Sequence, residues 1–301
     1  MKKQMVIHTK VWIVLILVLI VAGCGGPEEK KQKFFAKGEA LYAEEDFVKA
    51  RLEFKNSLQV DPKFAQAYYM LGMAELKLES YKKAFGAFTK AVSLDDALTD
   101  AHLQMGLLLR AGGQPDQAME KAELVLTREP DNTEARVLKG SVLMARGDDT
   151  AGSYLEGVLR DGHDGANVYM MLASTQARQN QRTKAVKTLK QGIEKHPDNI
   201  PLQMGLAQLY AAGKDKDKAE HVLKKICSMA PEERVHRLNL AKFYWSDGRK
   251  QEAEQVIDQF VDADPDDEKA KLTAARFYLD ARDLKRAQAT LEQGIEALPE
   301  D

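Results

Sequence analysis

The sequence is poor in cysteine, in aromatic residues and in net charge. Its 301 residues include two cysteines, Cys24 and Cys227, so at most one disulfide can form and a small disulfide-stapled fold is excluded. The 44 lysines and arginines nearly balance the 46 aspartates and glutamates, which leaves no bulk positive charge to attract nucleic acid. Aromatic residues make up only 7%, against 44% hydrophobic and 30% charged residues. This composition, rich in Ala, Leu, Lys and Glu, favours an all-helical protein.

The motifs of common metal and catalytic sites are also absent from the sequence. The six histidines form no pair at metal-ligand spacing, and neither His-Glu-x-x-His nor Cys-x-x-Cys occurs. Residues 211–215 (AAGKD) look like part of a phosphate loop, but the preceding Gly205 lies too far back and the segment is predicted to be a turn between helices. We therefore expect no catalytic residue, no metal and no cofactor, and we predict that the protein is not an enzyme.

The N-terminus carries the features of a secretion signal. Lys2, Lys3 and Lys10 precede a twelve-residue apolar run at 11–22 (VWIVLILVLIVA). A helix of that length rises only ~18 Å, which is short of a ~30 Å hydrocarbon core. The run ends in Val-Ala-Gly-Cys at 21–24, which resembles the lipobox of bacterial lipoproteins. That resemblance implies a signal peptide over 1–23 and an acylated Cys24; the alternative is an uncleaved anchor with a free thiol.

The resemblance to lipoproteins also implies a location. Gly25 stands where an aspartate would indicate retention in the inner membrane, so we expect an outer-membrane anchor that faces the periplasm of a bacterial cell envelope. Residues 24–33 are predicted to be the acylated cysteine and a short polar tether. The folded array is then expected over 34–301.

Small residues and prolines recur along the chain with one period. Six of the nine prolines, from Pro62 to Pro299, are spaced by 68, 67, 34, 34 and 34 residues. Alanine recurs with the same period at 50, 84, 118, 151, 185, 219, 253 and 287, and Gly or Ala at 38, 72, 106, 140, 173, 207, 241 and 275. The sequence is therefore an array of eight units that start near 31, 65, 99, 133, 166, 200, 234 and 268. The fourth unit is one residue short and lacks the proline.

Each unit is predicted to contain two helices. In the sixth unit Leu202, Leu206 and Leu209 lie on one face of the first helix, and Ala219, Val222 and Ile226 on one face of the second. Gly213 between them is expected to take the left-handed C-cap conformation. Pro231 then ends the second helix.

These units resemble the tetratricopeptide repeat, abbreviated TPR. That repeat has small residues at its eighth and twentieth positions, aromatic residues at its eleventh and twenty-fourth, and proline at its thirty-second. Tyr210, Tyr244 and Tyr278 match the eleventh position, and Phe54 and Phe88 the twenty-fourth. The resemblance implies an all-α, right-handed α-solenoid whose first helices line a concave groove.

The positions that line the groove in such arrays carry apolar side chains, several methionines and a few charges here. As the resemblance implies, we expect a peptide or a helix of a protein partner to contact Phe35, Tyr42, Tyr69, Met73, Leu103, Leu107, Arg110, Met144, Met170, Met204, Leu238, Lys242, Trp245 and Arg276. Flexible methionines suit a surface that adapts to a peptide. The alternative is that individual members of this set only pack between repeats. Phe35 and Glu39 stand where carboxylate-clamp TPRs need Lys and Asn, so recognition of that type is not expected.

The function that this resemblance implies is that of a lipid-anchored scaffold for protein partners. Residues 50–62 (ARLEFKNSLQVDP) resemble the first repeat of TPR lipoproteins in PEP-CTERM/exosortase systems, which implies a role in exopolysaccharide export or protein sorting. The alternative is an assembly factor for a type IV pilus secretin or an outer-membrane β-barrel machine. A carbohydrate-binding or hydrolytic envelope protein is the remote alternative. Leu284, Leu291, Ile295 and Leu298 form an apolar stripe in the final helix, so self-association or further repeats are expected at that end.

Overall fold

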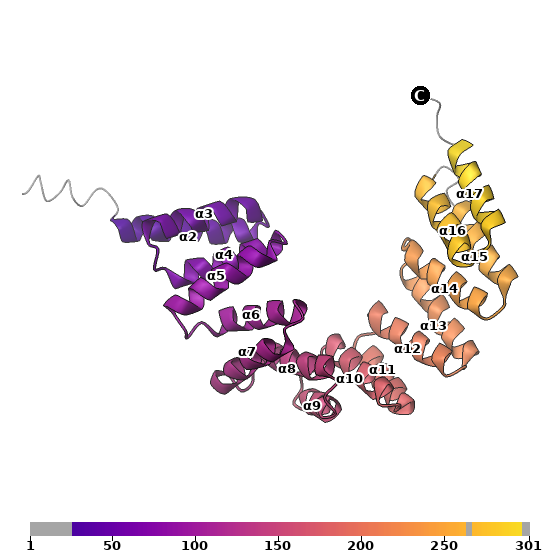
Figure 1. Ribbon diagram of the computed structural model, residues 1–301, viewed down its shortest axis with the longest axis horizontal. Helices are drawn as coiled ribbons and strands as arrows, with labels where there is room; N and C mark the ends of the chain where they lie inside the picture. Colours follow the sequence, from indigo (N-terminus) through magenta and orange to yellow (C-terminus); the bar gives the residue numbers. More distant parts are fainter. Residues whose placement is uncertain (1–25, 263–266, 297–301) are drawn as a thin grey trace, which may run out of the picture. The chain divides into compact units, whose positions relative to one another are not determined.

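The computed structural model describes residues 26–262 and 267–296, and all regular structure in these ranges is helical (Figure 1). The predicted signal peptide and Cys24 lie outside the described residues, as does Leu298. Sixteen helices are described in these ranges, and they alternate between the first and the second helix of successive repeats. The prediction of an all-α repeat protein is confirmed.

The helix bounds follow the repeat. The first helices are α2 (Pro27–Ala43), α4 (Ala65–Lys77), α6 (Thr99–Ala111), α8 (Thr133–Arg146), α10 (Ala166–Arg178), α12 (Ile200–Ala212), α14 (Arg234–Ser246) and α16 (Glu268–Asp280). The second helices are α3 (Phe47–Val60), α5 (Tyr81–Leu94), α7 (Pro115–Arg128), α9 (Ala151–Arg160), α11 (Arg182–Lys195), α13 (Lys216–Met229), α15 (Lys250–Asp262) and α17 (Leu284–Glu296). From α4 onward, each first helix begins at the residue where the period places the start of a unit.

The first repeat starts earlier than its sequence indicates. Helix α2 begins at Pro27, so the expected tether over 24–33 is wrong from Pro27 onward. Lys31 is buried, and its ammonium pairs with Glu28 at 2.7 Å and with Asp61 at 3.0 Å. The Ser57 hydroxyl donates to the Lys31 carbonyl at 3.0 Å. Because Ser57 and Asp61 lie at the end of α3, these contacts hold the polar segment on the first repeat.

The turn inside each repeat has one backbone geometry. The fifteenth residue of each repeat takes a positive φ at Glu45, Glu79, Gly113, Gly147, Asn180, Lys214, Gly248 and Arg282. In seven of the repeats the amide of the next residue donates to the carbonyl five residues back, as from Ser80 to Glu75 at 2.8 Å, which satisfies a carbonyl at the helix end. In the sixth repeat the left-handed residue is Lys214, with φ 61°, and not Gly213 as expected. Repeat register, rather than residue type, therefore fixes the position of the left-handed residue.

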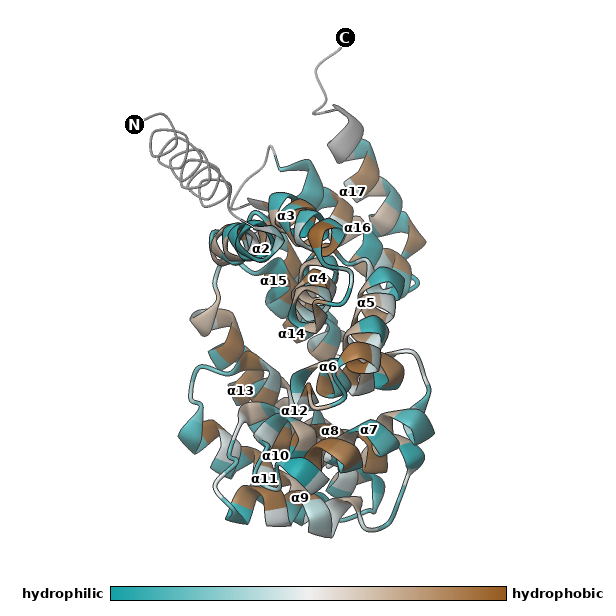
Figure 2. Cartoon of the chain, turned by 90° about the vertical axis from the view of Figure 1, so that its left-hand side faces the viewer, coloured by the Kyte–Doolittle hydropathy of each residue, from teal (hydrophilic) through white to brown (hydrophobic). Residues whose placement is uncertain are grey.

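Close packing of paired helices depends on the small residues. The alanines at the twentieth position are at most 1% exposed in all eight repeats. In the first two repeats, Gly38 and Gly72 pack against the rings of Phe54 and Phe88, so closely that an added Cβ would lie 2.6 and 2.5 Å from ring carbons. Figure 2 shows the resulting pattern, in which helices carry both hydrophobic and hydrophilic stripes.

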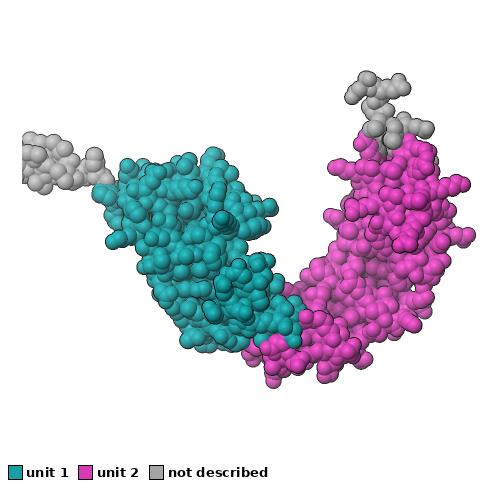
Figure 3. Space-filling view, in the orientation of Figure 1, with its two compact units in different colours: residues 1–147 teal, residues 148–301 magenta. Residues whose placement is uncertain are grey.

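The chain forms two compact units, residues 1–147 and 148–301 (Figure 3). The boundary falls inside the fourth repeat, between α8 and α9. This is the repeat that the sequence shows to be one residue short. The missing residue falls after Gly147, because the left-handed residues Gly147 and Asn180 are 33 apart, and before Ala151, because the alanine series regains its period of 34 from Ala151 onward. In the part of the chain that the structure describes, no helix has the length and apolar content to span a bilayer.

Candidate functional site

The predicted groove residues fall into three groups by exposure. Phe35 and Leu103 are buried; Tyr42, Tyr69, Met73, Met144, Met170, Met204, Leu238 and Trp245 are partly buried; Leu107, Arg110, Lys242 and Arg276 are exposed. Partial burial is the state expected of a side chain that packs at its base and keeps one face open to a partner. The two buried members need a different explanation.

Phe35 and Leu103 belong to the core and not to an open surface. Phe35 is 8% exposed, and its ring lies 5.7 Å from that of Phe54 and 4.8 Å from that of Phe64. Leu103 is 5% exposed. Because both side chains are buried, the expectation that they contact a ligand is wrong, and the alternative that they belong to the packing of the repeats holds for them.

In the first compact unit, the predicted residues Tyr42 and Tyr69 lie on neighbouring first helices. Tyr69 packs against Phe88, with the ring centroids 5.9 Å apart. Burial raises the pKa of Tyr69 to about 12, and the negative charge of Asp100 on α6 adds to the effect. Tyr69 is therefore a neutral hydrogen-bond donor at physiological pH.

The second compact unit has a pocket of about 340 Å³ between its first helices α12 and α14. Its base is formed by Ala207 and Leu223, which are 2% and 6% exposed. The small side chains of Ala207 and Ala211 leave the space that larger residues would fill. Its walls carry Met204 and Gln208 from α12 and Asn239, Lys242, Phe243 and Ser246 from α14. The structure thus brings the predicted residues Met204 and Lys242 into one pocket.

Beyond this pocket, the exposed face of α14 and α16 combines apolar and cationic side chains. The Lys242 ammonium pairs with Asp280 of α16 at 3.0 Å. Leu272 and Leu279 are 58% and 48% exposed, and they lie on the same side of α16 as the exposed Arg276. Exposed leucines of this kind mark a surface that a partner can cover.

Met170 and Trp245 lie outside the pocket between α12 and α14 and pack between repeats. An added Cβ at Gly205 would lie 3.2 Å from the Met170 methyl, so the methionine sits directly on α12. The Trp245 ring meets Phe277 edge to face at 5.6 Å, and the Lys250 ammonium lies 5.1 Å from its centroid. These contacts hold both side chains in place, so they support the surface beside the pocket.

Sequence reasoning missed Asn239, Phe243 and Ser246. They stand at the sixth, tenth and thirteenth positions of the seventh repeat, whereas the resemblance to TPR arrays placed the groove mainly at the second, fifth, ninth and twelfth positions. A pocket between two parallel first helices has one wall from each helix. The second of these helices, α14, therefore faces the pocket with a different side than α12 does. This geometry could have predicted the three residues from their repeat positions.

Little in the described part of the chain suggests redox or metal chemistry. No group of three His, Cys, Asp or Glu residues is placed there to hold a metal ion. Burial raises the pKa of the half-buried Cys227 thiol, which favours the unreactive neutral form.

The fold and the pocket define the class: a helical repeat scaffold that offers a surface to other molecules. Sequence models of the tetratricopeptide repeat match residues 35–99, 103–160, 176–239 and 244–301. The chain belongs to the tetratricopeptide repeat family, whose members are interaction scaffolds and are generally not catalytic. No curated protein sequence matches the chain.

Solved structures share the fold. A TPR protein from Parabacteroides merdae matches with a TM-score of 0.65 at 14% identity over 88% of this chain and 99% of its own. PilF of Pseudomonas aeruginosa matches with a TM-score of 0.58 at 17% identity, over 72% of this chain and 99% of its own. YrrB, described as a TPR protein with an unusual peptide-binding site, matches with a TM-score of 0.50 at 25% identity, over 56% of this chain and 88% of its own.

Proposed function

We propose that this protein is a scaffold that binds a peptide segment of a protein partner in the pocket between α12 and α14. The observation that carries the proposal is the pocket itself, about 340 Å³ in volume, with Met204 and Phe243 in its walls. This volume is within the range of ligand pockets, roughly 300–1,000 Å³. An apolar base with a polar edge suits a peptide that inserts one apolar side chain.

The polar groups at the edge of the pocket can hold the backbone of such a peptide. Gln208 and Asn239 each offer an amide that both donates and accepts hydrogen bonds, and they come from opposite walls. The flexible Met204 can adapt to the inserted side chain. The similarity to YrrB, which has a peptide-binding site, supports the same use of this array.

Selection from a random peptide library on the full chain tests the proposal. A peptide selected on the native protein is expected to bind at least about tenfold more weakly to Met204→Glu, because a carboxylate at the apolar wall is costly to bury. Leu284→Glu is the matched control, since Leu284 is 69% exposed on α17 and lies outside the pocket. Equal loss in both variants, or no loss with Met204→Glu, would show that the peptide binds elsewhere.

We further propose that Cys24 is acylated and anchors the scaffold to the bacterial envelope, most simply to the outer membrane. The Val-Ala-Gly-Cys stretch at 21–24 after an apolar run supports this proposal. Radiolabelled palmitate is expected to label the native protein and not Cys24→Ser, with Cys227→Ser as the control that keeps the label. Equal labelling of native protein and Cys24→Ser would contradict the lipoprotein assignment.

The envelope system that the scaffold serves is proposed from the segment at 50–62 and its resemblance to TPR lipoproteins of PEP-CTERM/exosortase systems. This proposal predicts that genes for glycosyltransferases and an exosortase lie beside the gene for this protein. Secretin or barrel-assembly genes in that place would contradict it.

A further inference from the structure

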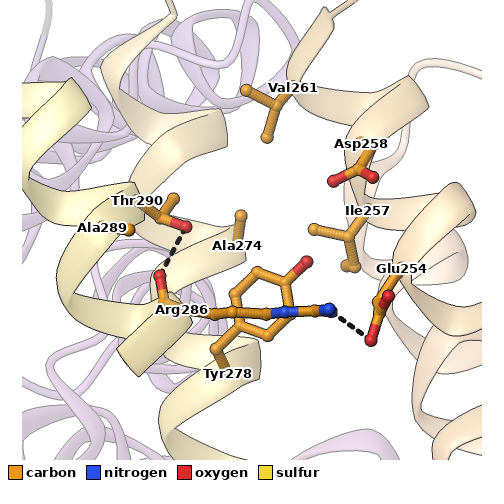
Figure 4. Close-up of a pocket in the computed structure, with 9 residues that line it drawn as sticks. All are labelled: Glu254, Ile257, Asp258, Val261, Ala274, Tyr278, Arg286, Ala289 and Thr290. Atoms are coloured by element: carbon orange, nitrogen blue, oxygen red, sulfur yellow. Dashed lines mark hydrogen bonds and ion pairs between the residues drawn. The ribbon is translucent and has the colours of Figure 1, made fainter. Parts of the chain in front are cut away.

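A second cavity, of about 390 Å³, lies among α15, α16 and α17 (Figure 4). Ile257 of α15 and Ala274 of α16 form its base and are each 1% exposed. Tyr278 and Arg286 lie across one side, and Thr290 of α17 lies opposite Asp258 of α15. Two of its three helices are second helices, so this cavity is separate from the pocket between α12 and α14.

Comparison of repeat positions explains why the cavity is there. The equivalent joint one repeat earlier, formed by α13, α14 and α15, has Leu240 where this joint has Ala274, and Gln255 where this joint has Ala289. Both replacements remove several side-chain atoms from the space between the helices. The cavity is therefore a property of these residues and not of the repeat in general.

The charges of the two joints also differ. In the earlier joint, Glu220 faces two cations, Lys224 at 2.7 Å and Arg249. In the cavity joint, the residue equivalent to Glu220 is Glu254, but the residue equivalent to Lys224 is Asp258. Among the described residues that line the cavity, Arg286 is the one cation; it pairs with Glu254 and lies 3.8 Å from Asp283 outside the lining. The carboxylates therefore outnumber the cation, and the cavity is acidic.

The Tyr278 hydroxyl gives the cavity a hydrogen-bond donor. In the earlier joint, the equivalent Tyr244 donates to Glu220 at 2.9 Å. Tyr278 is 5% exposed, no described carboxylate accepts a hydrogen bond from it, and Figure 4 shows its hydroxyl directed into the cavity on the side of Ile257. Burial raises the pKa of Tyr278, and the negative charge of Asp258 adds to this, so the donor keeps its proton at physiological pH.

We propose that this cavity is a second binding site, which takes an arginine or lysine side chain of a peptide together with an adjacent backbone carbonyl. The cationic group lies against Asp258 and Glu254, and the carbonyl accepts the hydrogen bond of Tyr278. Arg286 lies along the Tyr278 ring, with its guanidinium carbon 5.8 Å from the ring centroid. In the view of Figure 4, the part of the cavity drawn above Tyr278 and Arg286 is open. An acidic side chain in the same place would be repelled by Asp258 and Glu254.

The test uses two probes that differ in charge alone. Acetyl-Gly-Arg-Gly-amide and the same peptide with citrulline, the neutral isostere of arginine, are titrated into the full chain with methyl-labelled alanine. Ala274 and Ala289 line the proposed site, whereas Ala207 and Ala211 line the pocket between α12 and α14, so the methyl resonances that shift tell the two sites apart. The arginine peptide is expected to shift Ala274 and Ala289, and added salt is expected to weaken its binding.

Substitutions then assign the contacts. Asp258→Asn is expected to weaken arginine-peptide binding by about tenfold and Tyr278→Phe by about threefold to tenfold. Asp280→Asn is the control, because Asp280 lies on α16 outside the cavity and pairs with Lys242. Equal binding of the citrulline peptide, shifts confined to Ala207 and Ala211, or no shift at about 10 mM probe would overturn the proposal.

Discussion

At the scale of single residues, the Glu220 carboxylate is a charge that links two repeats through several partners. It accepts a hydrogen bond from Tyr244 at 2.9 Å and pairs with Lys224 at 2.7 Å and with Arg249. The Arg249 guanidinium, followed by Lys224, holds the pKa of Glu220 at about 2. These contacts join α13 to the next repeat through ion pairs and a hydrogen bond. Such directional bonds fix the relative position of the two repeats more specifically than a hydrophobic contact alone.

Glu220→Gln is expected to reduce the free energy of unfolding at neutral pH by about 1.5–3 kcal/mol, since the hydrogen bonds involve charged groups. The folded-state pKa is lowered, so the carboxylate stabilises the fold above its ordinary pKa of 4.5, and that contribution is lost as pH falls from about 4.5 to about 2. Urea unfolding over this range measures the difference between native and variant protein. The exposed Glu232→Gln is the control, and a difference that stays constant down to pH 2 would contradict the assignment.

Residue exposure was the part of the site that the sequence predicted least well. Repeat position selected Met204 and Lys242, which line one pocket, but it also selected Phe35 and Leu103, which are buried, because position does not tell how far a residue is covered. Glu75 shows the same limit. It occupies the eleventh position, where an aromatic residue is typical, and it is buried 3.8 Å from Arg51 and 4.0 Å from Lys55.

At the scale of helices, the volumes at the eighth and twenty-fourth positions compensate each other in the first two and the last four repeats. In the first two repeats glycine faces phenylalanine, in the pairs Gly38–Phe54 and Gly72–Phe88. In the last four repeats alanine at the eighth position accompanies leucine or isoleucine at the twenty-fourth, as with Ala207 and Leu223 or Ala241 and Ile257. In these repeats a smaller residue at one position thus accompanies a larger one at the other.

Gly72→Ala is expected to lower the free energy of unfolding by roughly 1–3 kcal/mol, because the new Cβ would lie 2.5 Å from a carbon of the fully buried Phe88. Gly86→Ala on the exposed face of α5 is the matched control and should raise it by up to about 1 kcal/mol, since no atom lies within 4 Å and alanine favours the helix. Phe88→Leu should restore part of the loss in a double variant. Equal effects of the two alanines, or strictly additive effects in the double variant, would show that the ring does not limit the approach of α4 and α5.

The helices themselves follow from the sequence with little error, and the exceptions have physical reasons. The period of 34 residues gives the starts of the first helices from α4 onward. It does not give the start of α2, because the ion pairs of Lys31 with Glu28 and Asp61 hold this segment in the first repeat. These pairs cannot be recognised from a polar run in the sequence. The expectation for Gly213 fails because it followed residue type, whereas the hydrogen bond from Asp215 to Tyr210 makes Lys214 the left-handed residue, at the position that the repeat register gives.

At the scale of the molecule, the repeat predicts the scaffold but not its binding sites. Both cavities arise where a small residue stands at a position that carries a larger one in a neighbouring repeat, Ala211 in one cavity and Ala274 and Ala289 in the other. The ladders of small residues show that helices approach closely, and only the three-dimensional arrangement shows where the space is left unfilled. The change from Lys224 to Asp258 at equivalent positions was the sequence signal for the acidic cavity.

The central claim, that the pocket between α12 and α14 binds a protein partner, is tested most directly by photocrosslinking in living cells. The photoreactive residue p-benzoyl-phenylalanine is placed at Gln208 or Asn239 in the opposite walls of the pocket, and at the exposed Gln288 of α17 as the control. The account predicts one crosslinked protein common to Gln208 and Asn239, absent from Gln288 and lost when Met204→Glu is added. The same crosslink from Gln288, or a crosslink at Gln208 that persists with Met204→Glu, would contradict it.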